Sequence, residues 1–223
     1  KALDGALIYA TDVRNIKFLF LPQEHDPDSF IREKGSEAFS VAVTNATPLS
    51  KFLIEVAWET CNQVGGIYTV IRTKVPSMVE KWGDDYALLG PYFPQTAAAE
   101  FEPITVTEET PLERAVLKLR QAGLGVHYGY WLITGKPKIV LFELDSLLKE
   151  VDAIKGRIWD NHKISTLGVE DLVNQTIIFG EMIRLLLTEV AEENKNKTHL
   201  VAHFHEWMAS TGLPDLKKDK VKI

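Results

Sequence analysis

The chain contains a short apolar run, Phe52-Leu53-Ile54-Glu55-Val56-Ala57-Trp58, and soon afterwards a glycine pair in Val64-Gly65-Gly66-Ile67-Tyr68. The run has the length and the apolar character of a buried strand. Residues 67–82 then have helical spacing, apart from Pro76, which we expect to kink or shorten that helix. A strand, a tight glycine loop and a helix in this order are the opening of a βαβ unit.

The same alternation continues to the end of the chain. Further strands are predicted at Tyr86–Leu89, Val126–Ile133, Lys138–Phe142 and Thr198–Phe204, and helices at about Pro111–Ala122, at Val169–Glu193 and from Glu206 onward. The last residues, Val221-Lys222-Ile223, have the character of another strand's opening. The predicted fold class is therefore α/β, with an incomplete parallel sheet.

The first fifty residues follow a different pattern. We expect a strand at Ile16–Leu21, ended by Pro22, and a helix at about Ser29–Val43. Asp26-Pro27-Asp28-Ser29 is a helix-start signature. Its two aspartates could also hold Mg²⁺, but helix capping explains them more simply. The sequence thus predicts a small α+β piece ahead of the larger α/β domain.

The composition describes a chain that can bury a core and that lacks a basic face. It has 223 residues, of which 45% are hydrophobic, a net charge of −6 and a pI near 5.6. Its first 50 residues hold five Lys or Arg against seven Asp or Glu. Because binding to a phosphate backbone needs a basic surface, we expect no nucleic-acid partner.

Cysteine use and hydropathy bear on the compartment. The single cysteine, Cys61, leaves no disulfide within the chain, which suits a reducing environment. The start, Lys1-Ala2-Leu3-Asp4, does not have the pattern of a signal peptide, and no stretch reaches the ~18–20 apolar residues of a membrane span. We therefore expect a cytoplasmic protein with no membrane partner. The oligomeric state has no signature in the sequence.

The glycine pair is the first candidate binding site. Gly65 and Gly66 would let the backbone approach a ligand closely, and the helix start after them offers free N–H groups suited to a diphosphate. The segment is not the G-x-G-x-x-G fingerprint, and no acidic residue ends the second strand to hold a ribose, so a dinucleotide is not expected. The alternative is a tight turn without a ligand.

The second candidate is His203-Phe204-His205-Glu206-Trp207, at the carboxyl end of a predicted strand. Ligands bind at this end of the strands in open α/β sheets. His203 and His205 share one face of the strand. They could bind a sugar or phosphate, form a metal pair, or be buried and satisfied by the backbone. The zinc-protease motif H-E-x-x-H is excluded by Ala209, and we predict no metal site.

The motifs together, in this order, resemble the glycogen synthases that use UDP-glucose, the animal and fungal type with bacterial relatives. The resemblance covers residues 54–223. It is carried by Glu55–Glu59, Val64–Val70, Leu89-Gly90-Pro91, Tyr128–Ile133, Pro137–Phe142, Lys155-Gly156, Trp159-Asp160 and Val201–Trp207.

The resemblance implies a fold and a reaction. The family has two Rossmann-like domains of the GT-B type and transfers glucose from UDP-glucose to the non-reducing end of glycogen with retention of configuration. It implies that Gly65 and Gly66 approach the donor diphosphate and that His205, the one catalytic candidate, contacts the transferred glucose. It implies no cofactor beyond the donor, and a glucan as acceptor. Gln63 stands where animal and fungal members have Lys or Arg.

The family's Arg/Lys pair and its Glu-x₇-Glu pair lie in the second domain and have no match here. Stabilisation of leaving-group charge is usually the largest catalytic term. We therefore expect this chain alone to be inactive.

Residues 1–53 resemble the end of the catalytic core of bacterial DNA primases. The match is carried by Phe18–Pro22, Asp26–Arg32, Lys34-Gly35, Glu37–Phe39 and Pro48–Leu53. The junction lies at about 50–55, where the primase pattern needs a helix and the synthase pattern a strand, and we expect the strand. Two alternatives to the synthase reading remain: a primase-derived nucleic-acid module, or a fusion or assembly product with no function as a unit.

Overall fold

A computed structural model describes residues 17–19, 21–22, 24–44, 47–48, 51–194 and 198–223. The chain divides into two compact units. One comprises residues 1–51 with 196–199, and the other comprises residues 52–195 with 200–223. No helix in the described ranges is long and apolar enough to cross a membrane.

The smaller unit contains a helix and a pair of very short strands. Strands β1 (Lys17–Phe18) and β2 (Thr47–Pro48) pair antiparallel. Helix α2 (Pro27–Thr44) is interrupted at Gly35, where φ is 86°. Asp26 Oδ1 accepts a hydrogen bond from Ser29 N–H at 2.7 Å, and Ser29 Oγ accepts one from Asp26 N–H at 2.9 Å. This reciprocal pair is a helix cap, which agrees with the simpler interpretation of the aspartates.

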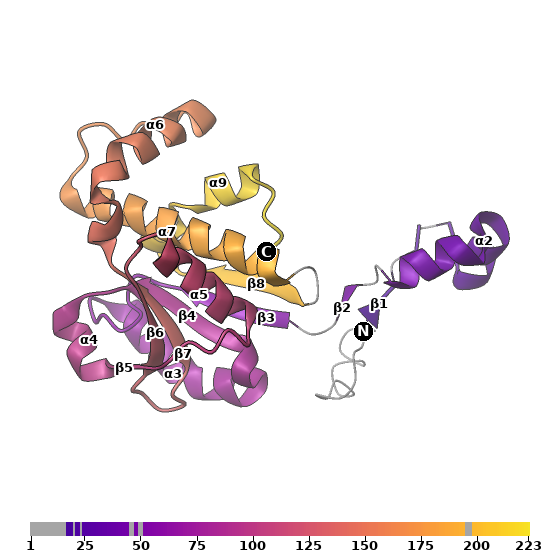
Figure 1. Cartoon of the computed structure of the whole chain (residues 1–223), viewed down its shortest axis with the longest axis horizontal. Coiled ribbons are helices and arrows are strands. Elements are labelled where there is room, and N and C mark those ends of the chain that lie inside the picture. The colour runs from indigo at the N-terminus through magenta and orange to yellow at the C-terminus, as the bar shows by residue number, and fades with distance from the viewer. Residues whose placement is uncertain (1–16, 20, 23, 45–46, 49–50, 195–197) are drawn as a thin grey trace. The chain divides into compact units, whose positions relative to one another are not determined.

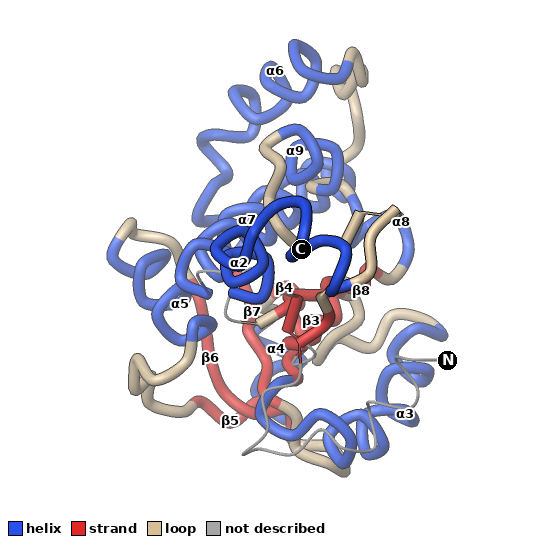
Figure 2. The backbone as a smooth tube through the Cα atoms, turned by 90° about the vertical axis from the view of Figure 1, so that its right-hand side faces the viewer, coloured by secondary structure: helices blue, strands red, loops and turns tan. Residues whose placement is uncertain are grey.

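The larger unit is built on a six-stranded sheet with the order β5-β6-β7-β4-β3-β8 (Figures 1 and 2). The strands are β3 (Lys51–Val56), β4 (Tyr86–Pro91), β5 (Phe101–Pro103), β6 (Val126–Trp131), β7 (Lys138–Phe142) and β8 (His199–Phe204). Strand β4 pairs parallel with both β3 and β7, whereas β6 pairs antiparallel with β5 and β7. The predicted α/β class is confirmed, and the sheet is parallel in its centre with an antiparallel edge.

Helices cover both faces of the sheet (Figure 2). Helices α5 (Pro111–Gln121) and α7 (Asp171–Asn194) pack on one face, where they form a core with Ile54, Val56 and Leu89. Helix α3 (Gly66–Trp82) packs on the other face against Leu53 and Ala57. Strand β4 is buried throughout because it is covered on both sides. This layering is expected for a parallel sheet.

The structure corrects two sequence expectations. Helix α3 is not shortened at Pro76 but continues to Trp82, because its face of Tyr68, Ile71 and Val75 is buried and this packing outweighs the loss of one backbone donor. Residues 221–223 form no strand. Instead the Val221 N–H donates to the Leu216 carbonyl at 3.1 Å, and the side chains of Val221 and Ile223 pack against the core.

Several short elements were not predicted. They are α4 (Pro94–Glu100), β5, the 3₁₀ segment Leu144–Glu150, α6 (Val151–His162) and α9 (Leu213–Lys218). Arg157 of α6 links α9 to the core. It donates to Asp215 of α9 at 3.1 Å and also pairs with Glu181 of α7. The whole stretch from residue 144 to 162 is thereby tied to α7.

Gly180 lies where helix α7 closely approaches the backbone at Thr211 and Gly212. A Cβ at this position would lie 2.1 Å from Thr211 Oγ1 and 2.6 Å from Gly212 N. We predict that Gly180→Ala lowers the free energy of unfolding by about 1–3 kcal/mol, because the two backbones must move apart. Urea denaturation of the purified chain measures this change.

Gly156→Ala is the matched control. Gly156 lies within α6 and is exposed, and a Cβ there meets nothing within 4 Å. This variant is expected to gain about 0.5–1 kcal/mol, since alanine loses less backbone entropy in a helix. Equal effects of the two substitutions would contradict the packing described for α7.

Candidate functional site

The two predicted site segments meet at one edge of the sheet. The glycine loop follows β3, and His205 follows β8, the strand beside β3. A hydrogen bond from His205 N–H to the Val56 carbonyl, 2.9 Å long, joins the ends of these two strands. The structure thus brings Gly65, Gly66 and His205 to the carboxyl edge of the sheet, where open α/β sheets bind ligands.

Glu59 organises the glycine loop. Its Oε2 accepts hydrogen bonds from Gly65 N–H at 2.8 Å and from Tyr68 N–H at 2.9 Å, at the first turn of α3. A carboxylate in this position satisfies unpaired amides and lies at the favourable end of the helix dipole. Glu59 thereby takes the place that a bound anion would have at these two amides.

Gly65 and Gly66 differ in what surrounds them. A Cβ on Gly65 would lie 3.2 Å from Glu59 Oε1, whereas a Cβ on Gly66 would meet nothing within 4 Å. In the described part of the chain, neither Gly66 N–H nor Ile67 N–H donates to a side chain. Gly66 therefore presents the open backbone surface of the loop, and Gly65 serves the internal cap.

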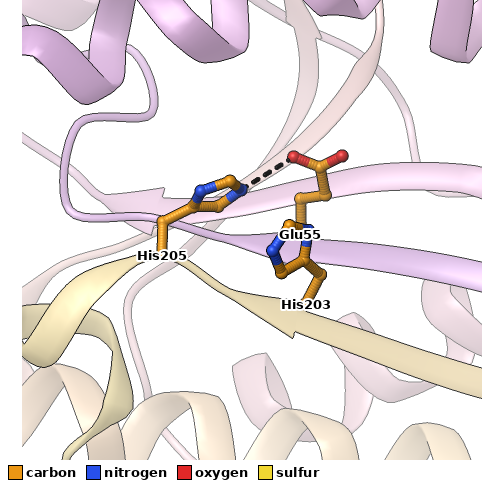
Figure 3. Close-up of side chains that lie close together, drawn as sticks. All are labelled: Glu55, His203 and His205. Atoms are coloured by element: carbon orange, nitrogen blue, oxygen red, sulfur yellow. Dashed lines mark hydrogen bonds and ion pairs between the residues drawn. The ribbon is translucent and has the colours of Figure 1, made fainter.

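A buried carboxylate holds His205. Glu55 lies in β3 with only 1% of its surface exposed, and its Oε2 lies 3.0 Å from His205 Nε2 (Figure 3). The same oxygen lies 2.8 Å from Lys74 Nζ. Lys74 belongs to α3. One oxygen atom therefore connects β3, α3 and the end of β8, and it fixes the orientation of the His205 ring.

The charge of Glu55 is stabilised by its partners. Burial by itself would raise the pKa of Glu55, but the hydrogen bonds from His205 and Lys74 outweigh burial and bring this pKa below its ordinary value of 4.5. The other oxygen, Oε1, is buried and has no hydrogen bond of ordinary geometry to any residue that the structure describes. Burial, followed by the neighbouring charge of Glu55, raises the pKa of the Tyr86 phenol.

The two histidines have different surroundings. His205 is buried, whereas His203 is exposed, and their ring centroids lie 4.3 Å apart. Burial, followed by the electrostatic effects of His205 and Lys74, lowers the pKa of His203. Of the alternatives open from the sequence, satisfaction by the backbone alone is wrong for His205, because its ring nitrogen faces a carboxylate.

Glu206 follows His205 directly and adds negative charge to this edge. Its φ of 57° lies in the left-handed region, which is strained for a residue other than glycine. Burial raises its pKa, and the carboxylate of Glu59 adds to that rise. The edge around the glycine loop is therefore acidic, and Gln63 contributes no positive charge to it.

A cavity of about 540 Å³ opens elsewhere on the same edge. Residues that follow β4 and β7 line it, together with the first turns of α7; they include Tyr92, Phe93, Glu143, Leu144, Asp171 and Asn174. Parallel strands β4 and β7 both end there, so the cavity has the position of a ligand pocket in this type of sheet.

Sequence reasoning missed Glu55, Glu59, Lys74 and Glu206. A charged residue inside an apolar run was the available signal for Glu55, since buried carboxylates are paired. Its partners are His205, which lies 150 residues further along the chain, and Lys74 of the next helix, and spacing alone cannot identify them.

By its fold, the larger unit is a Rossmann-like α/β domain with a sheet that is parallel in its centre. The family model for glycogen synthase matches residues 55–223. The chain therefore belongs to the glycogen synthase family. The matched range begins near the end of β3, and the comparison does not extend to the first fifty residues, whose resemblance to DNA primase stays a prediction.

Curated relatives agree with this assignment. The chain is 41% identical over 173 residues to "Glycogen [starch] synthase" of Dictyostelium discoideum, 38% over 161 residues to the liver enzyme of Rattus norvegicus, and 34% over 178 residues to isoform 1 of Saccharomyces cerevisiae. These matches cover 77%, 72% and 77% of the chain. They cover 19%, 23% and 25% of the relatives, so the chain spans about a quarter of their length or less.

We predict that Glu55→Gln lowers the free energy of unfolding at neutral pH by about 3 kcal/mol, because it removes one partner of a buried ionic contact. Since the folded pKa of Glu55 is lowered, this contribution is present above pH 4.5 and is lost as the pH falls through the folded pKa. The difference in the free energy of unfolding between wild type and Glu55→Gln should therefore become smaller at acid pH. Urea denaturation at several pH values measures it.

Lys74→Met and the double variant complete the test. If the contact between Glu55 and Lys74 is formed, the double variant should be less destabilised than the sum of the two single changes. The pairing would be contradicted if the two single changes had additive effects on the free energy of unfolding. It would also be contradicted if the difference between wild type and Glu55→Gln stayed constant down to acid pH.

Proposed function

We propose that this chain is the donor-side part of a retaining glucosyltransferase that transfers glucose from UDP-glucose to the non-reducing end of glycogen. Membership of the glycogen synthase family carries this proposal. The donor needs no metal and no further cofactor. Gly66 would receive the diphosphate, Gly65 would shape the loop, and His205 would contact the glucose that is transferred.

The geometry at the carboxyl edge supports these roles. The amides of Gly66 and Ile67 lie at the start of a 17-residue helix, where partial positive charge favours a phosphate oxygen. His205 is oriented by Glu55, so its ring needs no reorganisation on binding. An oriented ring can hydrogen-bond a sugar hydroxyl with little loss of side-chain entropy.

The same edge also limits what the chain can do alone. Glu59 already occupies the Gly65 and Tyr68 amides, and Glu206 adds a second carboxylate nearby. A diphosphate brings further negative charge to this acidic surface. By family resemblance, the cations that neutralise the leaving diphosphate belong to a second domain. We therefore expect weak donor binding and no turnover.

Calorimetry with UDP and UDP-glucose tests the donor site. We predict weak binding of both, and its loss in Gly66→Ala, because the new methyl group projects into the space proposed for the diphosphate while meeting nothing in the folded chain. Gly156→Ala should bind as wild type does. His205→Gln should weaken UDP-glucose relative to UDP, since only UDP-glucose carries the sugar that His205 would contact.

Either of two results would refute this placement. One is that Gly66→Ala binds UDP unchanged. The other is that a chain with a cooperative unfolding transition binds neither ligand at millimolar concentration.

A glycogen-elongation assay tests the expectation that the chain alone has no turnover. With UDP-glucose and glycogen, the chain alone should incorporate no glucose above a blank without protein, because charge stabilisation of the leaving group is missing. Incorporation that disappears in Gly66→Ala would show instead that this part of the enzyme is sufficient for transfer.

We further propose that the protein acts in the cytoplasm and that residues 1–53 are a primase-derived appendage without a role in glucosyl transfer. The lone buried Cys61 supports the first point, since it has no disulfide partner in the sequence. The ordered resemblance of residues 18–53 to primases supports the second. The acidic balance of that segment argues against a nucleic-acid module.

A further inference from the structure

Three potential metal ligands converge beside the glycine loop. Glu55, His203 and His205 each offer a ligand atom, and these three atoms lie within 4.8 Å of one another (Figure 3). The two histidines come from the end of β8, and the glutamate comes from the neighbouring strand β3. The sequence motifs did not reveal this set of ligands, because Glu55 lies 150 residues away from His205 in the chain.

We propose that Glu55, His203 and His205 form a binding site for a divalent first-row transition metal, with Zn²⁺ as its natural probe. Two imidazoles and one carboxylate are a ligand set that zinc accepts. Mg²⁺ and Ca²⁺ prefer all-oxygen sets, so neither fits this site. The site shares His205 and Glu55 with the proposed donor site, but metal binding there is a separate property that does not require glucosyl transfer.

The ligand atoms need to move only a little to surround a metal ion. In a tetrahedral zinc site with ligand bonds of about 2.0–2.2 Å, ligand atoms lie roughly 3.3–3.5 Å apart. His205 Nε2 and Glu55 Oε2 are already 3.0 Å apart. His203 is exposed, so its side chain can rotate to close the remaining distance. Solvent would fill the fourth position on the exposed side.

Lys74 pairs with the same carboxylate that a metal would use. Its ammonium lies 2.8 Å from Glu55 Oε2 and supplies the positive charge that a metal would otherwise supply. The Lys74 side chain is 30% exposed, so it can turn into solvent when a cation binds. Metal and ammonium therefore compete for the same carboxylate, and removal of the ammonium should favour the metal.

Zinc binding to the full chain, measured by competition with a chromophoric chelator, tests the proposal. Wild type should bind one Zn²⁺ at this site. His203→Gln should weaken that binding at least ten-fold, because even loss of an outer-sphere partner costs roughly ten-fold or more. Lys74→Met should bind Zn²⁺ more tightly than wild type. The Co²⁺ form should show the intense visible absorption of tetrahedral coordination.

His199→Gln is the matched control, since His199 is an exposed histidine of the same strand. It should leave zinc affinity unchanged. Unchanged affinity in His203→Gln would overturn the proposal, as would an octahedral Co²⁺ spectrum. So would zinc binding that is lost only when the other paired histidines, His127 beside Glu143 or His162 beside Asp215, are replaced.

Discussion

A single buried carboxylate holds the functional edge of this protein together. Glu55 is almost fully enclosed, and a charge so placed must be compensated or it would destabilise the fold. Lys74 from the α3 face and His205 from the end of β8 provide the compensation at one oxygen atom. Because these partners come from different elements, the position of the His205 ring follows from the packing of the whole sheet rather than from its local turn.

A second carboxylate, Glu59, shapes the other half of the edge. It caps α3 from within the loop and takes up the amides of Gly65 and Tyr68. Only the Gly66 side of the loop remains open to a ligand. The loop is therefore preorganised but acidic. A diphosphate bound here would need cations from elsewhere, which fits a chain that covers only 19–25% of its relatives in the family.

The larger features of the fold could be predicted from local pattern. The apolar runs gave β3, β4, β7 and β8, the strand expected at the junction near residue 52 is present, and helical spacing gave α3, α5 and α7. The elements α4 and β5 were missed because residues 94–103 are short of apolar periodicity. The strand expected at Val221–Ile223 is replaced by packing onto the core.

The site could be predicted only in part, because the arrangement of its side chains depends on contacts between residues that are far apart in the sequence. The residue types at Gly66 and His205 pointed to the edge, since glycine loops and strand ends are where such folds bind ligands. The roles of Glu55, Glu59 and Lys74 needed the tertiary structure. Glu55 and Lys74 meet between strand β3 and helix α3, and Glu59 folds back onto the amides of its own loop. A linear sequence pattern does not record which of these side chains meet.

The most direct test of the account is a UDP titration of the isotopically labelled chain, followed by NMR. The amides of Gly66 and Ile67 and the ring of His205 should shift together, with one saturation curve, while the amide of Gly156 stays unchanged. Shifts confined to the cavity lined by Tyr92, Phe93 and Leu144, with none at Gly66, would contradict the central claim that the glycine loop and His205 form the donor site.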